Sequence, residues 1–162
     1  REQDHRILPY YLSGSDERQF NAPGFRIPMP TIMRTPPTQF PEYHSSFDNL
    51  KFITPDALRD TLQFVLDTLF VVDNNRTYKN IYRAEPFLSD KGIFTQVHVG
   101  PYGVFNKGKA GVDPGYLNQI VIHETDGRQD LLSIAEKWSC PFPELLHASE
   151  KFKRVDLVNL VE

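Results

Sequence analysis

The clearest pattern in the chain predicts an amphipathic helix that begins after Thr54. Thr54 suits the N-cap, Pro55 suits the first helical position, and Asp56 complements the positive end of the helix dipole. One or two preceding strands are too few to cover the apolar face of this helix, so we expect its sheet to lie outside these 162 residues. The residues of that face recur at helical spacing until Asp73-Asn-Asn75 ends the pattern, and we expect them to be buried: Leu58, Leu62, Val65, Leu66, Leu69 and Val72.

The segment before this helix reads mainly as loop. An apolar run from Ile7 to Leu12 stops at Ser13-Gly14-Ser15-Asp16, which is typical of a strand that enters a loop. The stretch from Asn21 to Pro41 is dense in proline, which fixes the backbone and removes donors from a sheet. It predicts a rigid loop, in which only Thr31–Arg34 could be extended.

The second half of the chain carries weaker patterns that suggest a winged helix. We interpret residues 76 to 119 as a connector with at most one strand, Ile93–Val97. The sequence therefore predicts two parts, residues 1–80 and residues 81–162. In the second part we expect a strand, a turn, two helices and a closing strand, in the order Ile120–His123, Thr125–Gly127, Leu131–Trp138, a helix after Pro143, and Val155–Leu160.

Composition narrows the chemistry that the chain can perform. Cys140 is the single cysteine, which excludes an intramolecular disulfide and a thiolate zinc knuckle. Any metal must therefore bind histidine and carboxylates. The net charge of -3 provides no overall basic field, so nucleic-acid binding is not expected. No apolar run approaches the roughly 20 residues that span a bilayer, and we expect a cytoplasmic protein without membrane contact.

His44 is the strongest candidate for a metal ligand. It lies in a loop directly before the capped helix, with Glu42 and Asp48 close in sequence. A neutral imidazole binds zinc well, and a metal-bound histidine usually donates its second ring N–H to a carboxylate or carbonyl. The alternative is an ordinary loop histidine beside a solvated acid.

A second candidate group is the charged triplet Asp16, Glu17 and Arg18. It follows the predicted strand, and open α/β sheets bind ligands at the ends of their strands. The same residues also fit the start of a helix, with Ser15 as the cap and two acids at the positive end. The two interpretations are compatible.

Taken together, Gly14-Ser-Asp-Glu-Arg-Gln-Phe20, Pro41-Glu-Tyr-His44 and Asp48-Asn49 resemble the co-catalytic zinc aminopeptidase superfamily. The chain is especially similar to a bacterial branch of aminopeptidase-like proteins that ends in a winged helix. The resemblance covers residues 7 to 75 well and the remainder loosely. Two positions depart from the pattern, because Glu17 replaces a common histidine and Ser45 replaces a common threonine.

The resemblance implies an α/β fold, in which the C-terminal fragment of a zinc-exopeptidase-type domain with a mixed sheet precedes a small winged-helix α+β domain. It also implies that His44 is the final ligand of a dinuclear zinc site whose other ligands and general base lie further toward the N-terminus. The isolated chain is then expected to be inactive without that missing part of the catalytic domain. The substrate would be a peptide or small amide, and the remaining residues would contact it or support the ligand: Asp16, Glu17, Arg18, Glu42, Tyr43 and Asp48.

A different class of function also fits the sequence. The chain could belong to a binding or regulatory protein that contacts a partner through the winged helix. The predicted last helix offers cations near its end, but it also carries Glu144 and Glu150. Cations are expected in the last turn of any helix. A protein partner is therefore favoured over DNA.

Overall fold

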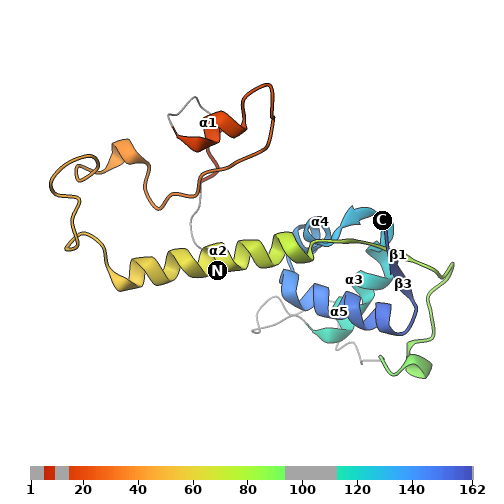
Figure 1. Ribbon diagram of the computed structural model, residues 1–162. Helices are drawn as coiled ribbons and strands as arrows, with labels where there is room; N and C mark the ends of the chain where they lie inside the picture. The colour runs from red at the N-terminus through yellow and green to blue at the C-terminus, as the bar shows by residue number, and fades with distance from the viewer. Residues whose placement is uncertain (1–5, 10–14, 94–112, 162) are drawn as a thin grey trace. The chain divides into compact units, whose positions relative to one another are not determined.

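The computed structural model describes residues 6–9, 15–93 and 113–161 (Figure 1). The chain divides into two compact units, Arg1–Thr61 and Leu62–Glu162, and the boundary between them falls in the sequence of helix α2 (Pro55–Asn74). The first unit also contains the short helix α1 (Asp16–Phe20) and the 3-10 turn η1 (Pro37–Gln39). The second contains the remaining elements: β1 (Thr77–Asn80), η2 (Leu88–Lys91), α3 (Pro114–Glu124), β2 (Asp126–Asp130), α4 (Leu131–Trp138), α5 (Phe142–Arg154) and β3 (Val158–Leu160).

The first unit consists mainly of loops, as the proline content predicts. Apart from η1, residues 21 to 41 form no helix or strand, and the extended piece expected at Thr31–Arg34 is not a strand. The strand expected from Ile7 to Leu12 is not formed at residues 7 to 9, while residues 10 to 12 lie outside the described ranges. Prolines leave few backbone donors for a ladder in this part of the chain.

Helix α2 begins as predicted, but its apolar face is not buried. The Thr54 hydroxyl accepts a hydrogen bond from the Ala57 N–H at 3.2 Å, which confirms the cap. No residue of α2 is buried, and Leu58, Leu62 and Val72 remain 62%, 59% and 64% exposed. Among the residues that the structure describes, no helix is long and apolar enough to cross a membrane.

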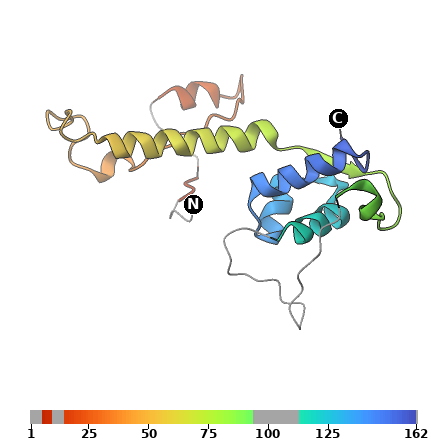
Figure 2. The ribbon, with the colours of Figure 1, turned by 90° about the horizontal axis from the view of Figure 1, so that it is seen from below.

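The second unit has a core of its own, built from three helices and an antiparallel sheet (Figure 1, Figure 2). The strands lie in the order β2, β1, β3, and α5 packs against both α3 and α4. Leu145 and Phe152 of α5 are completely buried, together with Val158 of β3. Leu145 and Phe152 therefore point inward, as their helical spacing predicts, whereas Leu146 is only partly buried.

The strand predicted at Ile120–His123 is wrong, because these residues belong to α3. The Asp113 carboxylate accepts hydrogen bonds from the N–H groups of Gly115 and Tyr116 at 2.8 and 3.2 Å, so it caps a helix that starts at Pro114. Leu117, Ile120 and Val121 then fall on one buried face. Packing of that face against α5 outweighs the strand preference of the β-branched residues.

The turn predicted at Thr125–Gly127 is instead a bulge near the start of β2. Thr77 pairs with Asp130 and Lys79 with Asp126, so β2 carries extra residues opposite β1. Gly127 adopts a φ of 86°, and a Cβ at this position would lie 3.2 Å from the Lys79 Cγ. The positive φ therefore favours glycine here, and the nearby Lys79 side chain would have to shift slightly to admit a larger residue.

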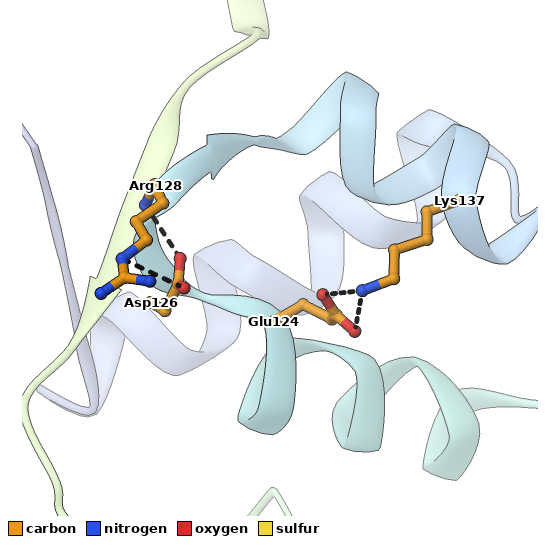
Figure 3. Close-up of polar contacts among 4 residues, drawn as sticks. All are labelled: Glu124, Asp126, Arg128 and Lys137. Carbon is orange, nitrogen blue, oxygen red and sulfur yellow. Dashed lines mark hydrogen bonds and ion pairs between the residues drawn. The ribbon is translucent and has the colours of Figure 1, made fainter.

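The two helices and the closing strand of the second unit follow one another in the predicted order. Strand β1 lies between β2 and β3 and completes the sheet. Helix α4 has the predicted bounds, α5 begins one residue before Pro143, and β3 forms the second half of the predicted closing strand. The strand expected at Ile93–Val97 lies almost wholly outside the described residues. Figure 3 shows two local polar contacts. The Lys137 ammonium of α4 donates to both carboxylate oxygens of Glu124 at 2.8 Å, and the backbone N–H of Arg128 donates to the Asp126 carboxylate at 2.9 Å.

Candidate functional site

His44 occupies a tight turn in an unusual backbone conformation. The Ser45 N–H donates to the Glu42 carbonyl at 3.1 Å and closes a four-residue turn with His44 in its third position. The φ of His44 is 55°, and a type II turn requires a positive φ at this position, where glycine or asparagine is usual. A residue other than glycine held this way costs about 1–3 kcal/mol, and such residues cluster at functional sites.

The Ser45 side chain bridges the two sides of this turn. Its hydroxyl donates to the Glu42 carbonyl at 2.8 Å and accepts a hydrogen bond from the Phe47 N–H at 3.2 Å. Serine hydroxyls commonly make such local bonds to a backbone group two residues on. The backbone on both sides of His44 is therefore connected through one hydroxyl.

The imidazole of His44 stacks on its neighbour Tyr43. The ring centroids are 4.0 Å apart with an interplanar angle of 15°. Tyr43 also meets Phe40 edge to face at 5.7 Å, and Phe40 stacks on Phe52 at 5.8 Å. His44 is exposed, and its ring forms no hydrogen bond or ion pair with another described residue. Both ring nitrogens are therefore available to a ligand.

The acids near His44 flank the turn without touching the imidazole. Glu42 is half-buried and contributes its backbone carbonyl to the turn, whereas Asp48 is exposed on the next turn of the loop. In the described part of the chain, neither carboxylate is hydrogen-bonded to the His44 ring. Their assignment as orienting groups stays a prediction.

The charged triplet lies on helix α1. The helix start predicted for Asp16 and Glu17 is confirmed, but the Ser15 side chain makes no capping hydrogen bond. Asp16 and Arg18 are exposed, while Glu17 is half-buried. Of the predicted site residues, Tyr43 and His44 are in direct contact, whereas the triplet sits on its own short helix.

The described residues can provide one ligand of a metal centre. Among them, no three His, Cys, Asp or Glu side chains lie close enough together to hold a metal ion. The exposed imidazole of His44 fits a single zinc ligand, because both of its nitrogens are accessible. Further ligands would come from polypeptide beyond the described residues.

Among the described residues, the cysteine and the histidines other than His44 are packing or surface residues. Cys140 is buried, and burial raises the pKa of its thiol, which fits a packing role. His123 and His147 are exposed on α3 and α5, whereas His5 and His98 lie outside the described residues. The hydroxyl bridge of Ser45 and the aromatic group around Tyr43 were not predicted from the sequence, although a serine in a loop commonly bonds the backbone two residues on.

Three comparisons relate the chain to known proteins. Residues 1–75 match the family described as "Domain of unknown function (DUF4910)". Over 159 residues the chain is 32% identical to a Clostridium acetobutylicum protein described as "Putative polysaccharide biosynthesis protein with aminopeptidase-like domain", and the match covers 98% of this chain and 35% of that protein. The fold is similar to the crystal structure of a "putative peptidase" from Clostridium acetobutylicum, with a TM-score of 0.73 and 31% identity over 94% of this chain and 31% of the other.

The chain spans about a third of the length of the relatives that it matches. Both are described in terms of a peptidase, although neither description mentions a metal. The similarities extend over nearly the whole of this chain.

Proposed function

We propose that this chain is part of a zinc-dependent, aminopeptidase-like hydrolase in which His44 supplies one metal ligand. The observation that carries the proposal is the exposed imidazole held on a turn with a positive φ. The similarity to two peptidase-like relatives supports it. A backbone conformation that costs energy at a histidine is better explained by a ligand role than by packing, because the ring is exposed.

In a zinc hydrolase the metal activates water and polarises the scissile carbonyl, and a dinuclear site does so with two ions. The residues of this chain would bind and orient. His44 would offer a neutral ring nitrogen, and Glu42 or Asp48 would accept the other ring N–H. Stacking on Tyr43 would limit rotation of the imidazole. Asp16, Glu17 and Arg18 would contact a peptide or small amide substrate.

We further propose that additional polypeptide of the catalytic domain covers the apolar face of α2. Leu58, Leu62 and Leu69 are each more than half exposed, and Leu50 just before the helix is 88% exposed. Soluble monomers rarely expose contiguous apolar patches of this kind. The relatives are about three times as long as this chain, so their remaining residues could supply the sheet on which such a helix packs.

The metal assignment is tested on the full-length protein that contains this chain. Zinc bound after dialysis is measured by mass spectrometry for the natural protein, for His44→Ala and for the matched control His147→Ala. His147 is a second exposed histidine and lies on α5. We expect zinc to fall in the His44 variant alone, together with hydrolysis of an aminoacyl anilide. Equal zinc in all three proteins would remove His44 from the metal site.

For the second unit we propose a winged-helix-like module that contacts a protein partner. Helices α4 and α5 are joined by Ser139, Cys140 and Pro141, a helix-turn-helix arrangement that supports this proposal. Exposed His147, Lys151 and Arg154 share one face of α5. A mobility-shift assay with duplex DNA separates the alternatives: we expect no shift at about 0.15 M salt, and a shift that weakens with salt would favour nucleic acid.

A further inference from the structure

We propose that Ser45 is a positioning residue, whose hydroxyl holds the His44 backbone in the conformation that presents the imidazole. The inference rests on the proposed function, because the task assigned to His44 is metal binding. Two hydrogen bonds of the Ser45 side chain carry it, to the Glu42 carbonyl at 2.8 Å and from the Phe47 N–H at 3.2 Å.

The turn needs such a restraint because histidine does not favour its backbone geometry. A φ of 55° brings the Cβ of His44 close to its own backbone, and relaxation to a negative φ would remove that crowding. Relaxation would also swing the imidazole to a different direction. The Ser45 hydroxyl opposes this change, because it binds one backbone group before His44 and one after it.

The position of Ser45 favours a specific role for the hydroxyl over a packing role. Ser45 is exposed, so removing its hydroxyl leaves no cavity in a core. The stacking of His44 on Tyr43 depends on the same turn, since both rings are carried by its two central residues. Loss of the hydroxyl should therefore loosen the imidazole while the surrounding fold stays intact.

The test compares zinc affinities of the full-length protein, measured by competition with a chromophoric chelator. Ser45→Ala and Ser45→Val remove the hydroxyl, whereas Ser45→Thr keeps it with the shape of valine. Ser46→Ala is the matched control, because Ser46 is also exposed and offers its backbone carbonyl, at 3.4 Å, to the Asn49 side chain. We expect alanine and valine to weaken zinc binding about five- to ten-fold, and threonine and the control to change it less than about two-fold.

The outcomes separate the two proposals. If His44→Ala loses zinc while Ser45→Ala and Ser45→Val bind it normally, the positioning role is wrong and the proposed function stands. If threonine weakens binding as much as valine, the hydroxyl is not responsible and the role is again wrong. If His44→Ala keeps its zinc, the proposed function fails and the positioning role fails with it. Thermal midpoints identify any variant that does not fold, in which case the threonine and valine pair decides.

Discussion

The hydroxyl of Tyr78 donates a hydrogen bond to the Glu150 carboxylate at 2.5 Å and so joins β1 to α5. Tyr78 is 1% exposed, and its burial, reinforced by Glu150, raises the pKa of the phenol well above its usual value. Glu150 also lies 3.7 Å from the Lys153 ammonium. The central strand of the sheet is thus connected to the helix that forms the middle of the core.

Replacing Tyr78 with phenylalanine should lower the free energy of unfolding by about 1–2 kcal/mol, because it removes a partly buried hydrogen bond to a charged acceptor. Urea unfolding monitored by circular dichroism measures the change. Lys153→Ala is the control, since it removes an exposed ion pair expected to contribute less than about 0.5 kcal/mol. Equal losses in the two variants would show that the hydrogen bond adds nothing beyond surface charge.

Stability should fall at alkaline pH because of Tyr82. Burial raises its pKa to about 12, against an ordinary value of 10.0. Below pH 10 both states are protonated and the contribution of Tyr82 is fully present. Between 10 and 12 the unfolded state loses its proton first, so the free energy of unfolding falls by up to about 1.4 kcal/mol per pH unit.

The raised pKa of Tyr78 acts in the same direction as that of Tyr82. Urea unfolding at a series of pH values, compared between the natural protein and Tyr82→Phe, measures the slope. Phenylalanine also loses the hydrogen bond to the Ile122 carbonyl at 3.0 Å, which lowers stability at every pH. An unchanged alkaline slope in the variant would rule out Tyr82 as a source.

The opposite pH dependence is expected from Asp130, which caps α4. The Ser133 N–H donates to its carboxylate at 2.8 Å and lowers its pKa below the ordinary 3.8. Its contribution is therefore present above that ordinary value and is lost as the pH falls through the lowered pKa. Asp130→Ala should cost about 1 kcal/mol at neutral pH.

Asp130→Asn is the matched variant, because the amide oxygen can still accept the capping hydrogen bond. It should keep most of the stability at neutral pH but lose part of the acid dependence. Acid titrations followed by circular dichroism compare the three proteins. A similar loss for alanine and asparagine at neutral pH would argue that charge, and not the cap, is responsible.

At His44, stability and ligand binding should respond differently to substitution. The φ of 55° suits glycine, so His44→Gly should unfold at higher temperature than His44→Ala, by the equivalent of about 1 kcal/mol. Under the proposed function, both variants of the full-length protein should lose zinc equally. Differential scanning fluorimetry and metal analysis measure the two properties. If alanine proved as stable as glycine, the left-handed conformation would not persist in solution.

The apolar face of α2 can be tested with a charged substitution. Leu69 is 52% exposed here, but burial against the rest of the full-length protein should make Leu69→Lys cost more than about 2 kcal/mol. Asp67→Lys is the control, because Asp67 lies on the opposite side of the helix, where we expect less than about 0.5 kcal/mol. Thermal unfolding measures both. A small effect of Leu69→Lys would mean that this face stays in water.

Local signals were sufficient where an element is defined by its own neighbours. The cap at Thr54 and the break at Asp73–Asn75 predicted α2 almost to the residue, and the periodic apolar residues predicted α4. They failed at Ile120–His123, where three β-branched residues favour a strand in isolation but are buried in helix α3. His44 was predicted as a candidate ligand from its motif and its position in a loop, whereas the stacking of its ring on Tyr43 could not be predicted.

The sequence by itself determined where α2 and α4 begin and end, because capping bonds and helical periodicity involve residues within a few positions of each other. Only the tertiary structure decided that β1 lies between β2 and β3, that Gly127 forms a bulge against Lys79, and that Tyr78 meets Glu150. The physical reason is that ladder pairing and core contacts join residues far apart in the chain. The free energy of these contacts depends on which surfaces pack together, and local sequence preferences do not specify this.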